Sequence, residues 1–104
     1  MAEKVRVEVL YFDGCPTYMS ATRNVSEVLS ELGMEAEVEM VAVNSDEDAE
    51  RLRFPGSPTI RVDGRDLFPM PERGVWALGC RMYATPEGLR GYPTREMVGD
   101  ALAH

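Results

Sequence analysis

The chain has 104 residues, of which 44% are hydrophobic and 28% are charged, and its formal charge is −7 at pH 7. This length suits one domain, residues 1–104, that buries a single core without a disulfide or metal framework. A negatively charged surface repels the phosphates of nucleic acids, so we expect no nucleic-acid partner.

No apolar run reaches the roughly 18 residues that a membrane span requires, and residues 1–5 lack the features of a signal peptide. We therefore expect a cytoplasmic protein without a membrane partner, in a compartment that keeps thiols reduced. Cys15 and Cys80 are the only two cysteines, and we expect them to be free or transiently redox-active there. His104 is the only histidine, and the sequence indicates neither a cofactor nor a metal site.

The first half of the chain predicts a strand, a helix and a second strand. Residues 5–11 alternate apolar and polar side chains, as a strand does. Apolar residues then recur at spacings of three and four over residues 18–32, which forms one helical face, and Gly33 suits the position after a helix end. Residues 35–43 alternate again. A helix-length connection between these two strands makes them parallel.

The second half predicts a short helix, two further strands and a last helix. Ser45 with Asp48 resembles a capping box, and the helix that it opens must end before Pro55. Residues 59–62 read as a third strand, and the Asp63-Gly64 pair that follows is a strong hairpin signal.

Residues 80–83 predict a fourth strand, antiparallel to the third. The preceding loop, residues 68–79, is expected either to form a lid or partner surface or to bury Trp76 on a helix. Thr94 caps the last helix. The predicted fold is α/β, with a four-stranded mixed sheet and the element order β-α-β-α-β-β-α.

Cys15 lies at the junction of the first strand and the first helix, with Pro16 in the predicted first helical position, where its missing N–H costs nothing. A thiol there faces unpaired N–H groups and the positive end of the helix dipole, which favour the thiolate. Asp13 acts in the opposite direction if its carboxylate lies close. A small buried hydrophobe is the alternative interpretation of Cys15, but its position favours a functional thiol.

Cys80 also has two interpretations. Its place beside Met82 and Tyr83 favours a core residue. As a resolving thiol it would form a disulfide with Cys15, which requires Cα atoms within about 7 Å. Tyr18 either donates its hydroxyl to the Cys15 sulfur or covers the core.

Two motifs resemble those of the thioredoxin fold. Cys15-Pro16-Thr17-Tyr18 is similar to the C-P-x-C of glutaredoxins, with Tyr18 in place of the second cysteine, and Gly56-Ser57-Pro58-Thr59 resembles the loop of that family that contains a cis-proline. The resemblance implies a thioredoxin-like three-layer sandwich with a cis Ser57–Pro58 bond beside the Cys15 sulfur. It also implies a free Ser57 backbone that pairs with an extended peptide or glutathione. The substrate-binding residues implied in this way are Pro16, Ser57, Pro58 and Thr59.

A closer likeness is to small bacterial thioredoxin-like proteins with D-G-C-P, G-S-P-T-I-x-V-D-G and C-R-x-Y segments. The corresponding residues here are 13–16, 56–64 and 80–83. Some members of that group carry selenocysteine in the redox position, which implies redox or peroxide chemistry. This chain departs from the dithiol pattern because it has no C-x-x-C, and the departure favours monothiol chemistry.

The expected function is thus that of a thiol-dependent redox protein, either a thiol–disulfide oxidoreductase or a thiol peroxidase. Cys15 attacks a disulfide, a peroxide or a glutathione adduct, and Cys80 or an external thiol resolves the product. The expected partner is a protein disulfide or a glutathione-type small thiol. Two alternatives stay open. In one, Cys15 and Cys80 bind a soft metal or metalloid in a non-enzymatic module. In the other, a redox-inactive adaptor contacts proteins through the Pro58 loop and the Trp76 segment.

Overall fold

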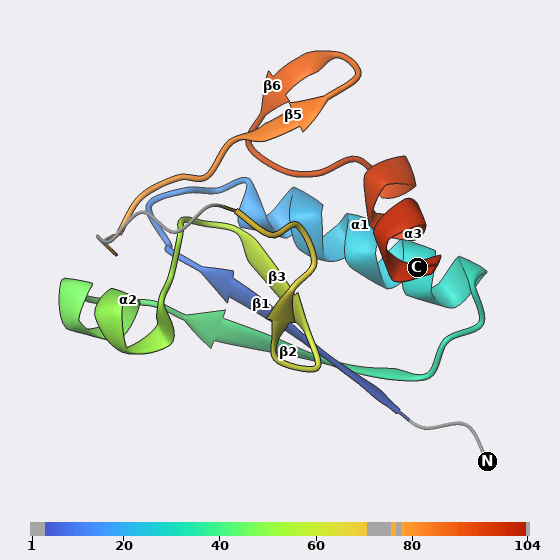
Figure 1. Cartoon of the computed structure of the whole chain (residues 1–104), viewed down its shortest axis with the longest axis horizontal. Coiled ribbons are helices and arrows are strands. Elements are labelled where there is room, and N and C mark those ends of the chain that lie inside the picture. Colours follow the sequence, from blue (N-terminus) through green and yellow to red (C-terminus); the bar gives the residue numbers. More distant parts are fainter. Residues whose placement is uncertain (1–3, 71–75, 77, 104) are drawn as a thin grey trace.

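A computed structural model of the chain describes residues 4–70, 76 and 78–103. These residues form a four-stranded mixed sheet in the order β2-β1-β3-β4, three helices and a separate two-stranded hairpin (Figure 1). No helix in these ranges is long and apolar enough to cross a membrane. The elements are β1 (Val5–Tyr11), α1 (Tyr18–Glu31), β2 (Ala36–Ala42), α2 (Asp46–Leu52), β3 (Thr59–Val62), β4 (Arg65–Asp66), β5 (Tyr83–Thr85), β6 (Gly88–Arg90) and α3 (Arg95–Ala103).

The predicted unit of strand, helix and parallel strand is confirmed. β1 and β2 pair in parallel, with Val7 opposite Val38, and the buried residues of α1 recur at spacings of three and four. The chain leaves α1 through Gly33, whose φ of 66° is a left-handed conformation that glycine adopts without steric cost. β3 lies antiparallel to β1 on its other side. β1 is therefore an inner strand of the sheet, and Cys15 lies in the turn that follows its C-terminal end.

Helices pack against both faces of the sheet. Val7 of β1 contributes to a core cluster with residues of α1 and α3. Leu10, which points to the opposite face, packs in a second cluster with Ala49 of α2 and with Phe54. α1 and α3 thus cover one face, and α2 packs against the other face near the C-terminal end of β1.

The predicted helix caps are also present. The Ser45 hydroxyl accepts a hydrogen bond from the Asp48 N–H at 3.1 Å at the start of α2. The Thr94 hydroxyl accepts one from the Met97 N–H at 3.1 Å at the start of α3. Each cap satisfies an N–H group that has no partner within its own helix.

The expected fourth strand is wrong. The strand beside β3 is β4, which follows immediately after the Asp63-Gly64 turn; both turn residues have positive φ, the requirement of a tight two-residue hairpin. Cys80 instead forms an isolated parallel bridge with Ser57. Tyr83 begins β5, which pairs with β6 and not with the main sheet. The element order is therefore β-α-β-α-β-β-β-β-α.

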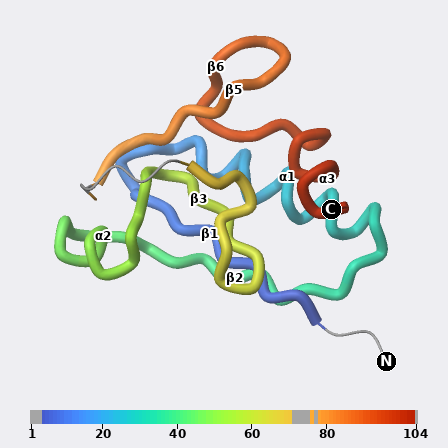
Figure 2. The backbone as a smooth tube through the Cα atoms, in the orientation of Figure 1, coloured from blue at the N-terminus to red at the C-terminus, as the bar shows by residue number. Residues whose placement is uncertain are grey.

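The β5–β6 hairpin projects from the four-stranded sheet and leads back towards α1 (Figure 2). Two contacts anchor the chain that follows it. The Asn24 side chain of α1 donates a hydrogen bond to the Pro93 carbonyl at 3.0 Å. Gly91 lies so close to Thr17 that a Cβ at Gly91 would be 2.7 Å from the threonine methyl carbon. The hairpin therefore ends beside the turn that carries Cys15.

Candidate functional site

Cys15 is held in the turn between β1 and α1, where its N–H donates to the Phe12 carbonyl at 2.9 Å. Its side chain is joined to Cys80 by a disulfide, with the two Cα atoms 5.8 Å apart. This separation lies within the range that a disulfide requires. Cys15 is 3% exposed, whereas Cys80 is exposed. The interpretation of Cys80 as a core residue is therefore wrong.

Thr17, which the sequence analysis did not single out, supplies a hydroxyl that is hydrogen-bonded to the Cys15 sulfur. Its Oγ1 lies 3.4 Å from Sγ, and it donates the hydrogen bond because a disulfide sulfur carries no proton. α1 begins at Tyr18, so the prediction of Pro16 as the first helical residue is wrong. Thr17 is the residue before α1, but its side chain does not cap the helix. Its position two residues after Cys15 was the one feature of the sequence that could have indicated this contact.

The structure places two other residues near this turn without bringing their polar groups to the sulfur. The Tyr18 ring packs edge-on against Tyr11, with 4.4 Å between ring centroids. Asp13 is exposed. Within the described ranges, no hydrogen bond joins the Cys15 sulfur to the Tyr18 hydroxyl or to the Asp13 carboxylate. The proposed role of the Tyr18 hydroxyl stays a prediction.

The Ser57–Pro58 bond is cis, as the resemblance implied, and both residues are fully buried. The Ser57 carbonyl oxygen lies 3.7 Å from the Cys15 sulfur. The Ser57 hydroxyl accepts a hydrogen bond from the Phe12 N–H at 3.0 Å, which fixes this loop to the end of β1. The loop and the cysteine turn therefore form one structural unit around the sulfur.

The expectation of a free Ser57 backbone is wrong. The Ser57 N–H donates to the Gly79 carbonyl and the Arg81 N–H donates to the Ser57 carbonyl, both at 2.8 Å. The approach requires Gly56, because a Cβ there would lie 2.8 Å from the Arg81 Cβ, and because its φ is +135°. The segment that carries Cys80 thus occupies the edge expected to receive a partner.

Arg81 is a second residue that sequence analysis missed. Its side chain is 2% exposed and forms an ion pair with Asp66 of β4 at 2.9 Å. The guanidinium also donates to the Thr59 hydroxyl at 3.3 Å and to the Phe68 carbonyl, and it lies 4.7 Å from the centroid of the Tyr83 ring. The residues next to Arg81 in the sequence, Cys80 and Met82, give no indication that its side chain is buried.

The remaining predicted binding residues differ in their access to a partner. Pro16 is exposed. Thr59 is fully buried, and its hydroxyl donates to the Gly56 carbonyl at 2.6 Å. The Pro58 carbonyl accepts a hydrogen bond from the Tyr83 hydroxyl at 2.5 Å, and burial raises the pKa of this phenol above its usual value. Thr59 and Pro58 therefore hold the loop in place and do not present polar groups to solvent.

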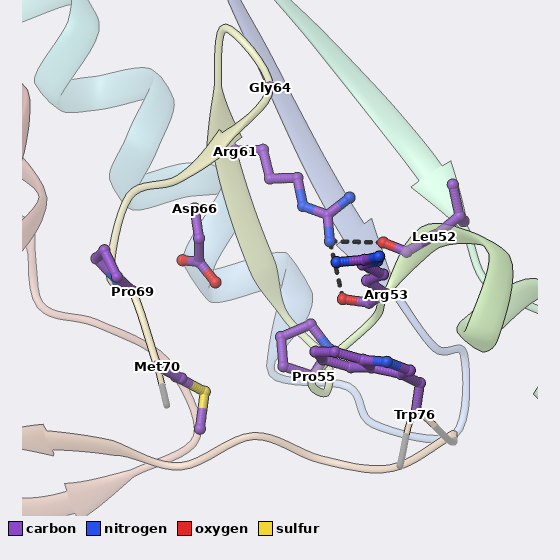
Figure 3. Close-up of a pocket in the computed structure, with 9 residues that line it drawn as sticks. All are labelled: Leu52, Arg53, Pro55, Arg61, Gly64, Asp66, Pro69, Met70 and Trp76. Carbon is purple, nitrogen blue, oxygen red and sulfur yellow. Dashed lines mark hydrogen bonds between the residues drawn. The ribbon is translucent and has the colours of Figure 1, made fainter. Parts of the chain in front are cut away.

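A pocket lies between the end of α2, β3 and Trp76, whose ring lies beside Pro55 (Figure 3). Trp76 is half-buried and packs against the cluster that includes α2 residues. The Arg61 side chain in this pocket donates to the carbonyls of Leu52 and Arg53. Residues 71–75 and 77 of the expected lid lie outside the described residues. Pro69, Met70 and Trp76 of the predicted loop line this pocket, but none of the residues predicted to act in catalysis or substrate binding does so. The candidate site is therefore the disulfide.

The Cys15 and Cys80 sulfurs lie within bonding distance just before α1. This arrangement supports reversible formation of a disulfide. Across the described ranges there is no group of three or more side chains that could hold a metal ion. Comparisons of the chain with family models, with curated proteins and with solved structures each gave no match.

Proposed function

We propose that this chain is a thiol–disulfide redox protein with a thioredoxin-like fold, in which Cys15 and Cys80 alternate between a dithiol and a disulfide. The observation that carries the proposal is the Cys15–Cys80 bond at the start of α1, beside the cis Ser57–Pro58 loop. The mixed sheet, with its helices on both faces, supports the three-layer arrangement. The cytoplasmic location remains part of this proposal.

The proposed mechanism uses two cysteines. It differs in this respect from the monothiol mechanism that the absence of a C-x-x-C motif favoured. In the reduced protein, the dipole and N–H groups of α1 favour the Cys15 thiolate, and the Thr17 hydroxyl can donate to it. A substrate disulfide or peroxide first oxidises Cys80 to a mixed disulfide or a sulfenic acid and releases one thiol or one molecule of alcohol or water. The Cys15 thiolate then attacks the Cys80 sulfur and forms the intramolecular disulfide, and the second substrate thiolate or hydroxide leaves. The oxidation removes two electrons and two protons from the dithiol, and a substrate disulfide or peroxide accepts them.

The test is a redox equilibrium. Samples of the protein are held in buffers with different ratios of glutathione to glutathione disulfide, free thiols are alkylated, and their number is determined by mass spectrometry. We expect a reversible transition between zero and two free thiols per monomer. Turnover of a small disulfide with glutathione as reductant should fall in Cys15→Ser, because the intramolecular disulfide can no longer form. Failure of the reduced pair to close again, or turnover that is unchanged in Cys15→Ser, would contradict the proposal.

A second candidate function is a soft-metal site formed by the two reduced thiolates, because the sulfurs converge within bonding distance. Titration of the reduced protein with Cu(I) would then give thiolate-to-metal absorbance at one equivalent, and Cys80→Ser would abolish it. Absorbance that is unchanged in Cys80→Ser would rule out the two-sulfur site.

A further inference from the structure

The backbone edge beside the cis-proline is filled by the chain itself. Ser57 is fully buried, and both its N–H and its C=O are hydrogen-bonded to the segment 79–81. An extended polypeptide would need these same two groups to add itself as a strand. Because each group already has a strong partner, such a strand can pair here only after this segment is displaced.

Contacts that do not involve the disulfide hold the segment in place. The buried Arg81 side chain pairs with Asp66 and donates to Thr59, and Gly56 lies in close contact with the Arg81 backbone. Reduction of the disulfide removes none of these interactions. The segment 79–81 is therefore expected to stay on the Ser57 edge in both redox states.

The two sulfurs differ in how an external thiol can reach them. Cys15 is 3% exposed and is enclosed by the Thr17 hydroxyl and the Ser57 carbonyl. Cys80 is exposed. Attack on Cys80 expels the Cys15 sulfur as a thiolate, which can accept a hydrogen bond from the Thr17 hydroxyl.

We propose that external thiols join the protein at Cys80 and that cysteines of extended polypeptides have no advantage over small thiols there, because the Ser57 backbone edge is already paired. This inference rests on the proposed redox function. An external thiolate forms a bond with the Cys80 sulfur, the Cys15–Cys80 bond breaks, and Cys15 leaves as a thiolate. A second external thiolate then attacks the external sulfur of the mixed disulfide. The products are the protein dithiol and one small disulfide, and Cys80 takes up its proton from solvent.

The test compares two uncharged thiols of the same chemistry with the oxidised wild-type protein. One is N-acetylcysteine amide, and the other is an extended peptide with blocked ends and one central cysteine between strand-forming residues. Uncharged probes avoid repulsion by the protein charge of −7. The rate constant of exchange is measured for each. The first adduct is quenched with acid and located by peptide mapping.

We expect similar rate constants for the two thiols, with the adduct on Cys80 and the free thiol on Cys15. Pairing of the peptide with Ser57 would add two backbone hydrogen bonds, enough to favour the peptide by about tenfold. A peptide advantage of that size, or an adduct on Cys15, would overturn this inference and leave the redox function standing. Exchange with neither thiol would overturn the redox function as well.

Amide hydrogen exchange supplies an independent measurement. The Ser57 N–H should remain protected after reduction, to an extent comparable with amides of the β1–β3 ladder, because Arg81 and not the disulfide retains the segment. Loss of Ser57 protection in a reduced protein whose ladder amides stay protected would mean that the edge opens, and it would overturn the inference that polypeptides have no advantage there.

Discussion

Replacement of Asp66 by asparagine tests whether Arg81 anchors the segment that carries Cys80. Asp66→Asn keeps the shape of the side chain but leaves the buried guanidinium without its carboxylate. Removal of one partner from a fully buried ion pair costs about 3–5 kcal/mol. Asp66 is 20% exposed and Arg81 keeps its contacts with Thr59, Phe68 and Tyr83. We therefore expect a loss of about 2–3 kcal/mol in the free energy of unfolding.

Urea unfolding followed by circular dichroism measures this loss, and Glu27→Gln is the matched control. Glu27 pairs with Arg95 at 3.3 Å, but these side chains are 45% and 51% exposed, so its substitution should cost no more than about 0.5 kcal/mol. The cost of Asp66→Asn should be the same in a protein that carries both Cys15→Ser and Cys80→Ser. If Asp66→Asn costs no more than Glu27→Gln, Arg81 does not anchor the segment.

Three further predictions concern the surroundings of the site and the cap of α2. Tyr83→Phe should lower the free energy of unfolding by about 1–2 kcal/mol, because the Pro58 carbonyl loses its buried partner. Burial raises the pKa of Tyr83 and keeps its phenol neutral in the folded state. Its stabilising contribution should therefore be complete below pH about 10 and should decline as the pH rises further. Urea unfolding at neutral and alkaline pH should show this loss of stability in the wild type and a smaller loss in Tyr83→Phe. Thr17→Val keeps the side-chain shape but removes the donor to Cys15, so in the Cys80→Ser background the pH of half-maximal iodoacetamide reaction should rise; an unchanged midpoint would exclude this hydrogen bond. Ser45→Ala should cost about 1 kcal/mol in urea unfolding by removal of the α2 cap, and no loss would mean that the cap contributes nothing.

The structure changes how the candidate site should be approached experimentally. A protein disulfide is one of the substrates expected for the proposed redox function. Here the Ser57 edge is already filled by the segment that contains Arg81, so a poor rate with protein substrates would not by itself exclude redox function. The comparison of a small thiol with a peptide separates these two conclusions.

The sequence by itself determined the elements that depend on neighbouring residues. Alternation in residues 5–11, the three- and four-residue spacing in α1, and the caps at Ser45 and Thr94 all reflect interactions within a few positions. The position of Cys15 at a helix start was predictable for the same reason. The cis bond before Pro58 followed only from the resemblance, because X–Pro bonds are cis in about 5% of folded cases.

Only the tertiary structure decided where Cys80 lies and what surrounds it. The sequence predicted residues 80–83 as a strand beside β3, but β4, which follows β3 in a short hairpin, pairs with β3 at that position. The disulfide joins residues 65 positions apart, and the burial of Arg81 depends on Asp66 and Thr59, which lie in separate parts of the chain. The spacing of apolar residues along the sequence does not predict such contacts. They depend on how whole helices and strands are placed relative to one another, and not on the local preferences of the residues that make them.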